Sequence, residues 1–422
     1  MKKLLSVVLV LAMSMTFLTG CGNTDTETNN DAVDTETTDD AADDATEGDS
    51  EETADDAADV ETGDAAGSEG TLKIGGIGPT TGDAAVYGLA VKNAAQLAVD
   101  EINAAGGVNG MMLELNFQDD ESDAEKAVNA YNTLKDWNMQ VLVGTVTSTP
   151  CIAVAEKSAA DNIFQLTPSG SAVECIANDN TFRVCFSDPN QGKASAQYIG
   201  ENSLATKVAV IYDSSSVYSS GIYETFAAEA ANQSLEIVAA EAFTADSNKD
   251  FTVQLQKAKD SGAELLFLPI YYNEASLILA QAKTIGFAPT FFGCDGLDGI
   301  LAVENFDTSL AEGVMLLTPF AADAEDDLTK NFVSTYDATY GGIPNQFAAD
   351  AYDAVYAIKA AAEKAGITAD MSASDICDAF KTAMTEITVD GLTGTGMTWT
   401  ADGEPNKEPK AVKIVDGVYT AM

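Results

Sequence analysis

From residue 72 onward, the chain alternates short apolar runs, rich in β-forming residues, with longer amphipathic stretches. This alternation predicts an α/β fold in which parallel sheets are covered by helices on both faces, because parallel strands need crossover helices between them. The expected strands lie at 72–78, 112–118, 140–144, 163–166, 207–212, 235–240, 264–269 and 290–293. The expected helices lie at 84–105, 124–137, 151–160, 221–231, 251–261 and 275–285.

The alternation is interrupted over residues 187–206 and then starts again. A folded part that spans residues 71–422 also exceeds what one hydrophobic core usually serves. Both observations predict two α/β lobes.

The residues that follow each predicted strand are the expected place of function, because ligands of such sheets bind beyond the carboxyl ends of the strands. These strand ends are rich in hydroxyl groups, glycine and carboxylates, at 78–82, 145–150, 167–171, 213–220, 271–274 and 294–296. We also expect Ser148 or Thr149, followed by Pro150, to cap a helix whose free backbone N–H groups favour an anion.

Charge and composition exclude several classes of function. Residues 71–422 hold 19 Lys and Arg against 48 Asp and Glu, which argues against nucleic acid or an anionic membrane as a direct ligand. The chain has no His, so it has no Ser-His-Asp or Cys-His nucleophile and no imidazole metal site. No catalytic residue, cofactor or metal is therefore predicted.

Two further groups of residues have more than one interpretation. The five cysteines of the folded part show no CxxC pair and no zinc-like spacing, so we interpret them as small buried residues. A disulfide bond between Cys175 and Cys185 is the alternative outside the cell. Asp119 and Asp120 are interpreted as the end of a strand at the surface, with acid–base chemistry or a metal as the alternative.

The N-terminus predicts export. Lys2 and Lys3 precede an apolar run over residues 4–18, which is shorter than the about 20 residues of a membrane span. The run ends in Leu18-Thr19-Gly20-Cys21, which resembles the lipobox of bacterial lipoproteins. The resemblance implies a signal peptide over residues 1–20, lipidation of Cys21 and an extracytoplasmic protein with a lipid anchor in the cell membrane. An ordinary signal peptide with an incidental Cys is the alternative.

An acidic segment follows Cys21. Residues 22–70 hold 19 Asp and Glu and no Lys, Arg or aromatic residue. Such a segment cannot bury enough apolar surface to offset its ordering entropy, and its like charges repel. We therefore expect residues 21–70 to be the lipidated Cys and a disordered tether with a mean reach of roughly 40 Å. An acidic tail that binds a basic partner is the alternative.

The folded part resembles the bacterial solute-binding proteins of the branched-chain amino acid type. The resemblance begins with Ile74-Gly75-Gly76-Ile77-Gly78-Pro79-Thr80-Thr81-Gly82, Tyr87-Gly88 and the run 98–110, which ends in Asn109-Gly110. It continues through Asp119-Asp120, Val143-Gly144, Phe182-Arg183, Asp188, Gln191-Gly192 and the run 208–212, and it covers most of residues 72–400.

The resemblance implies a two-lobed venus-flytrap fold, in which each lobe is a parallel sheet with helices on both faces and three hinge crossovers join the lobes. Lobe 1 would be residues 71–187 plus 319–391, and lobe 2 would be residues 188–318 plus 392–422. A monomer of this kind closes on a small molecule and delivers it to an ABC permease.

The resemblance also implies how the head group of an amino acid is held. In the family, hydroxyl and backbone N–H groups of lobe 1 hold the α-carboxylate, and here these would belong to Ser148, Thr149 and Ser171. A backbone carbonyl and a carboxylate hold the ammonium, and here these would belong to Ser169 and Asp188. This division agrees with the physical need to pair both charges of a zwitterion that leaves water.

Lobe 2 would add Tyr218, Tyr271 and Asp295 to the ligand. The family commonly has Glu where this chain has Asp295, whose shorter side chain reaches less far toward the ammonium. Four tyrosines would line the part of the site that receives the ligand's side chain: Tyr87, Tyr218, Tyr271 and Tyr272. Alternatively, these rings only pack in the protein core.

The predicted function is therefore capture of a small amino acid, aliphatic or branched-chain, for an ABC permease. One alternative is a binding protein that senses another small solute, such as an amide or an aromatic acid, and couples to a receptor. The other is an enzyme that acts on amino acid derivatives, but the missing His and the absence of a nucleophile elbow oppose it.

Overall fold

The structure, a computed structural model, describes residues 70–422. The predicted signal peptide, Cys21 and the acidic segment up to residue 69 lie outside the described residues. Within residues 70–422, no helix is both long enough and apolar enough to cross a membrane.

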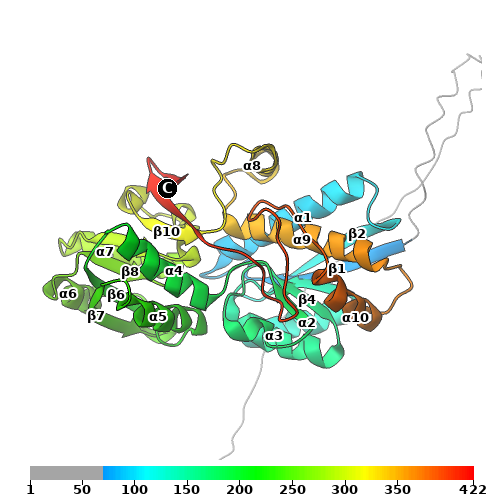
Figure 1. The fold of residues 1–422 in the computed structure, drawn as a ribbon, viewed down its shortest axis with the longest axis horizontal. Helices are drawn as coiled ribbons and strands as arrows, with labels where there is room; N and C mark the ends of the chain where they lie inside the picture. The colour runs from blue at the N-terminus through cyan, green and yellow to red at the C-terminus, as the bar shows by residue number, and fades with distance from the viewer. Residues whose placement is uncertain (1–69) are drawn as a thin grey trace, which may run out of the picture. The chain divides into compact units, whose positions relative to one another are not determined.

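The first sheet has five parallel strands in the order β2-β1-β3-β4-β5. They are β1 (Gly70–Gly78), β2 (Met111–Asp119), β3 (Val141–Gly144), β4 (Phe164–Thr167) and β5 (Thr181–Arg183). Figure 1 labels β1, β2 and β4 of this sheet. Helices α1 (Ala85–Ala104), α2 (Ala124–Asp136) and α3 (Ser148–Asp161) connect β1 to β4. Every residue of β3 and β4 is buried, as a central strand with helices on both faces requires.

The second sheet has seven strands in the order β12-β11-β10-β9-β8-β6-β7. They are β6 (Lys207–Asp213), β7 (Glu236–Phe243), β8 (Leu265–Leu268), β9 (Thr290–Gly293), β10 (Met315–Thr318), β11 (Lys410–Val415) and β12 (Val418–Ala421). Helices α5 (Val217–Ala230), α6 (Thr252–Asp260) and α7 (Tyr272–Thr284) connect β6 to β9, and α4 (Asp188–Glu201) packs against α5. The pairs from β7 to β10 are parallel, whereas β11 is antiparallel to both β10 and β12.

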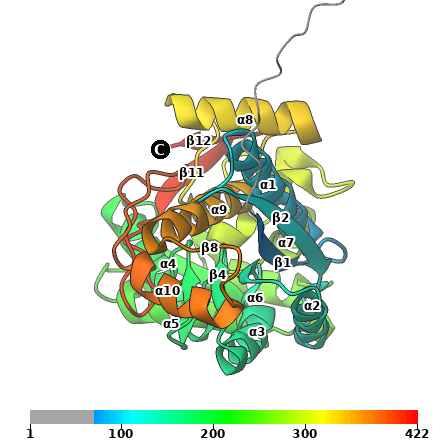
Figure 2. The ribbon, with the colours of Figure 1, turned by 90° about the vertical axis from the view of Figure 1, so that its right-hand side faces the viewer.

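Late segments of the chain return to the first sheet. Helix α9 (Gln346–Ala365) packs beside α1, and α10 (Ala373–Met384) packs against β4 (Figure 2). Helix α8 (Asp327–Tyr340) precedes them and contacts α1. The described residues also contain five short 3-10 helices: η1 (Val173–Ile176), η2 (Ala245–Ser247), η3 (Asp295–Leu297), η4 (Ile300–Ala302) and η5 (Thr308–Ala311).

The chain passes between the two sheets three times, after β5, after β10 and after α10. A buried ion pair holds the third crossing to α9, because the Nζ of Lys407 lies 3.0 Å from the Oδ1 of Asp350. On the same helix, Asp353 accepts hydrogen bonds from the backbone N–H groups of Leu392 and Thr393. Two sheets with three crossings agree with the expected two-lobed α/β class, while the residue limits given for the lobes stay a prediction.

The structure differs from the sequence-based predictions in four places. Strand β5 has no counterpart among the predicted strands. Residues 187–206 contain α4, which the sequence pattern does not predict because this helix packs through small residues rather than through an apolar face. At Gly192 the two helices are so close that a Cβ would lie 2.1 Å from Thr225 Oγ1 on α5. The second sheet is mixed rather than parallel, because the third crossing delivers β11 in the opposite direction. Helix α3 begins at Ser148, and Thr147 takes the N-cap position, so the predicted cap at Ser148 or Thr149 is wrong. The Ser148 hydroxyl instead accepts a hydrogen bond from the backbone N–H of Ala172.

Gly88, in the first turn of α1, offers a test of how tightly this helix packs. A Cβ at this residue would lie 1.9 Å from the carbonyl oxygen of Pro79, which is backbone and cannot rotate away. We expect Gly88→Ala to lower the free energy of unfolding by about 2 kcal/mol, measured by denaturant unfolding. The control is Gly221→Ala on α5, where the nearest atoms lie 3.5 Å away and better helix propensity should make the change neutral or stabilising. Equal effects of the two substitutions would contradict the predicted clash.

Candidate functional site

The six predicted strand-end segments all follow strands of the two sheets: β1, β3 and β4 in the first, and β6, β8 and β9 in the second. Segments from both sheets line a cavity of about 240 Å³. Three of the predicted site residues, Thr149, Tyr218 and Tyr271, are among its lining. The strand ends of the two sheets therefore meet, as the sequence predicts.

Four residues predicted to hold the amino acid head group lie around the start of α3 and the turn that follows β4: Ser148, Thr149, Ser169 and Ser171. The Ser169 hydroxyl donates to the carbonyl of Val146 at 2.7 Å, so this hydroxyl is engaged within the protein. Ser171 is 1% exposed, and its hydroxyl has no hydrogen-bond partner among residues 70–422. The backbone N–H of Asp188 donates to the carbonyl of Ser171 at 2.9 Å, which places these two residues side by side. Thr149, in contrast, is exposed and lines the cavity.

Asp188 is the most unusual group of the site. It is the first residue of α4, it is 2% exposed, and neither carboxylate oxygen has a hydrogen-bond partner in the described part of the chain. Burial raises the pKa of Asp188 well above its usual range; the nearby Ser171 hydroxyl and the charge of Arg183 oppose this increase, and the charge of Asp295 adds to it. A buried carboxylate without donors is costly, so this position favours a cationic group with hydrogen-bond donors.

Tyr218 and Asp295 form a hydrogen-bonded pair on the second-sheet side. The Tyr218 hydroxyl donates to Asp295 Oδ1 at 2.6 Å and accepts from the backbone N–H of Gly296 at 3.0 Å. The backbone N–H of Asp295 in turn donates to the side-chain carbonyl of Gln191 at 3.2 Å. Burial raises the pKa of Asp295 to about 6. The carboxylate of Asp295 therefore has a hydrogen-bond partner, whereas that of Asp188 has none among residues 70–422.

Tyr87 connects the first sheet's α1 to segments of the second sheet. Its hydroxyl donates to the carbonyl of Gly296 and accepts from the backbone N–H of Tyr272 at 3.3 Å. Its ring centroid lies 5.4 Å from that of Tyr271 and 4.0 Å from that of Phe347, the second residue of α9. The tyrosines predicted at the side-chain end of the site therefore form one aromatic cluster.

Sequence reasoning missed several residues that shape this site. Arg183, the only Arg of the chain, is 1% exposed and donates to the carbonyls of Gly170 and Ser171, so it fixes the turn that carries Ser171. Its Nε also lies 3.0 Å from a carboxylate oxygen of Glu404. The signal available in the sequence was that Arg183 is the chain's single Arg. Phe347 carried none, because it follows no predicted strand.

The remaining candidates do not form a second chemical site. Asp119 accepts hydrogen bonds from the Thr80 backbone N–H at 2.8 Å and the Thr81 hydroxyl at 2.6 Å, so it fixes the loop between β1 and α1. Asp120 is fully buried, so its predicted surface position is wrong. Between residues 70 and 422, no three His, Cys, Asp or Glu side chains lie close enough to hold a metal ion. All five cysteines there are buried and free, so Cys175 and Cys185 are not bonded in the structure.

The chain is similar to known proteins over almost its whole described length. A sequence model of the family described as periplasmic binding protein matches residues 71–417. The Leu/Ile/Val-binding protein homolog 3 of Brucella melitensis is 31% identical over 306 residues, which cover 72% of this chain and 81% of that protein.

Two solved structures resemble the fold closely. The branched-chain amino acid transporter substrate-binding protein LivJ of Streptococcus pneumoniae, in complex with isoleucine, has a TM-score of 0.76 at 31% identity, with 83% of this chain and 98% of that chain covered. The leucine-binding protein LivK of Thermotoga maritima has a TM-score of 0.74 at 25% identity, with 83% and 97% covered.

Proposed function

This chain belongs to the periplasmic binding protein family, and we propose that it captures a small aliphatic amino acid outside the cytoplasm and delivers it to an ABC permease. The observation that carries the proposal is the buried carboxylate of Asp188, which has no partner within residues 70–422 and lies beside the unpartnered hydroxyl of Ser171. The relatives named above bind leucine, isoleucine or valine, so the alternative of a sensor for an amide or aromatic acid is not favoured.

The site offers partners for both charges of a zwitterion. In this proposal, the ammonium binds to Asp188 and to the backbone carbonyl of Ser169, because both carboxylate oxygens of Asp188 are buried without a hydrogen-bond partner among residues 70–422. The α-carboxylate is placed at the hydroxyls of Ser148, Thr149 and Ser171 and at the first turn of α3, whose N-terminal N–H groups favour an anion.

The aromatic cluster receives the aliphatic side chain in this proposal. Tyr218 and Tyr271 approach from the second sheet, with Tyr87 from α1, and Asp295 orients Tyr218 rather than binding the ammonium directly. Members of the family bind solutes, and we propose that this chain likewise carries out no catalysis. We also propose that the protein is a monomer. Its lobe 1 would be residues 71–187 plus 319–391, and its lobe 2 residues 188–318 plus 392–422.

Calorimetry with matched ligands tests the ligand class. Leucine, isoleucine or valine is expected to bind with low-micromolar or tighter affinity, and at about 100 times the dissociation constant to stabilise the protein by about 2.7 kcal/mol. Leucinamide, which lacks the carboxylate, and 4-methylvalerate, which lacks the ammonium, should each bind at least about 100-fold more weakly, because each leaves buried groups unpaired. Tight binding of 4-methylvalerate or of an aromatic acid would remove the amino acid assignment and leave the fold unaffected.

The lipid anchor is a separate proposal with its own test. Cys21→Ala is expected to move the protein from the membrane fraction to the soluble fraction, because the acidic segment separates Cys21 from the folded part. Amino acid binding by the released protein should be unchanged. A Cys21→Ala protein that still sediments with membranes after a salt wash would show that Cys21 is not the anchor.

A further inference from the structure

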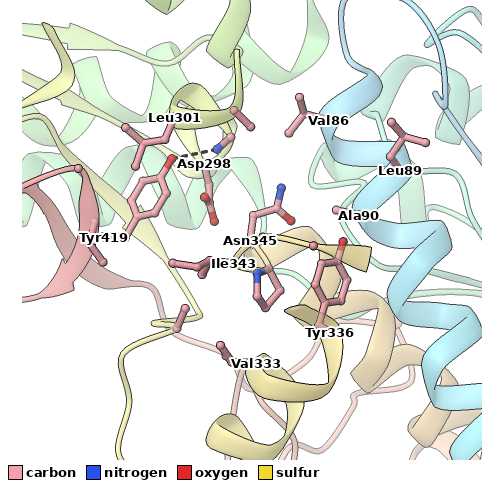
Figure 3. A pocket seen from close by; sticks show the side chains of 18 of the residues that line it. Val86, Leu89, Ala90, Asp298, Leu301, Val333, Tyr336, Ile343, Asn345 and Tyr419 are labelled. Carbon is pink, nitrogen blue, oxygen red and sulfur yellow. Dashed lines mark hydrogen bonds between the residues drawn. The ribbon is translucent and has the colours of Figure 1, made fainter. Parts of the chain in front are cut away.

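A second cavity, of about 570 Å³, shares no lining residue with the one beside Tyr218 (Figure 3). Its walls come from α1 and α8, which contact each other, from η4 and the turn between β11 and β12, and from the connection between α8 and α9. A molecule bound there would therefore touch helices that pack with the first sheet and segments that belong to the second sheet. None of the residues proposed above to bind the amino acid lines this cavity.

The cavity wall is mostly aliphatic. Leu89 on α1, Ile343 before α9 and Val418 on β12 line it with 44%, 62% and 41% of their surface exposed. Exposed aliphatic side chains that converge on one cavity mark a place where an apolar group can be buried.

One carboxylate forms the polar end of this cavity. Asp298 is 4% exposed, and its side chain points into the cavity (Figure 3). Its Oδ2 accepts from the backbone N–H of Gln346 at 2.7 Å, but its Oδ1 has no hydrogen-bond partner within residues 70–422. Burial raises the pKa of Asp298 to about 7, although the Gln346 N–H and the nearby Tyr419 hydroxyl oppose the increase, and the carboxylates of Asp295 and Asp350 add to it.

The other charges around the cavity point to the same kind of ligand. Asp323 is the only other charged residue in the lining, and no Lys or Arg lines the cavity in the described part of the chain. The same range provides no ion pair to Asp298. An ammonium ion supplies both the missing charge and the missing donor, whereas a ligand carboxylate would meet two like charges and no cation.

We propose that this cavity is a second ligand site, which binds a primary alkylammonium ion with its cationic head at Asp298 and its alkyl chain against Leu89, Ile343 and Val418. The alkylammonium ion would bind together with leucine rather than in competition with it, because the two sites share no residue.

The test uses three probes with the same six-carbon chain, added to the full chain at pH 8. Saturable binding of n-hexylamine is expected by calorimetry, n-hexanol should bind at least about tenfold more weakly, and hexanoate should not bind. Asp298→Asn, which keeps an oxygen for the Gln346 N–H, should remove the preference for the amine over the alcohol. Val418→Lys places a cation on an exposed part of the wall, so it should weaken hexylamine binding at least about tenfold without a loss of folding.

Leucine binding is measured separately on each variant. This measurement distinguishes failure of the second site from failure of the proposed amino acid site. Unchanged leucine binding with weakened hexylamine binding supports the second site. Three results would overturn the second site: displacement of hexylamine by leucine, binding of hexylamine no tighter than that of hexanol, or equally tight hexylamine binding by Val418→Lys and the wild type. If Asp298→Asn does not fold, the effect of Val418→Lys on hexylamine binding is sufficient to test the second site.

Discussion

Asp188→Asn is expected to weaken leucine binding by two to three orders of magnitude and, at the same time, to stabilise the ligand-free protein. The affinity falls because the ammonium would lose its buried counter-charge, and removal of one partner of such a pair costs about 3–5 kcal/mol. The stability rises because the carboxylate is buried with both oxygens unpartnered among residues 70–422, and a neutral amide avoids that cost.

The pH dependence gives the second half of this prediction. The pKa of Asp188 is raised in the folded protein, so the destabilisation by its charge appears as the pH rises above about 4, the value of an unfolded Asp. The stabilisation of Asp188→Asn should therefore be present at pH 7 and absent near pH 3, measured by thermal unfolding. Glu201→Gln, at the exposed end of the same helix, should change neither affinity nor stability. Wild-type leucine affinity in Asp188→Asn would remove Asp188 from the site.

Tyr271→Ala is expected to leave a protein that binds leucine weakly and does not close around it. The Tyr271 ring lies 4.9 Å from that of Tyr218 and 5.4 Å from that of Tyr87, so it contacts both sides of the site. Loss of such a central aromatic contact commonly costs about 2–4 kcal/mol, which is about 30-fold or more in affinity. A ligand drives a conformational change only through contacts that differ between the two states.

Small-angle scattering separates closure from affinity. The wild type should become more compact with leucine, Ser171→Ala should do so only at higher leucine concentration, and Tyr271→Ala should stay extended at saturation. Tyr223→Ala is the matched control, because Tyr223 stacks on Tyr212 at 4.3 Å on the second-sheet side and lines neither cavity. If Tyr271→Ala becomes as compact as the wild type, contacts from the second sheet do not drive closure.

The sequence predicts the repeating part of the fold well because each strand of that part is a short apolar run followed by an amphipathic helix. Eight of the nine strands from β1 to β9, and the helices between them other than α4, lie within a few residues of their predicted positions. The short strand β5 has no counterpart among the predicted strands. The pattern fails for α4, where Gly192 and small polar residues replace an apolar face and let α5 approach closely. It also fails for β11 and β12, which follow an irregular crossing and pair antiparallel.

The site could be predicted only in part, because strand ends reveal which loops meet but not which groups are already engaged. The side chains of Ser169 and Asp295 have hydrogen-bond partners within the protein, whereas those of Ser171 and Asp188 have none in the described chain. This difference arises from tertiary contacts such as those of Arg183, so no local pattern carries it. The amino acid roles given to these residues by family resemblance remain predictions until the substitutions above are measured.

The three crossings between the sheets determine when the chain can fold. The first sheet needs α9 and α10 to cover it, and the second sheet needs β11 and β12, which end at Ala421. The first sheet is therefore incomplete until α10 has been synthesised and the second until β12 has, so no single cut in the chain yields a finished half. A truncation at residue 345 would uncover both sheets at once, so partial products should be removed by proteases rather than persist as stable fragments.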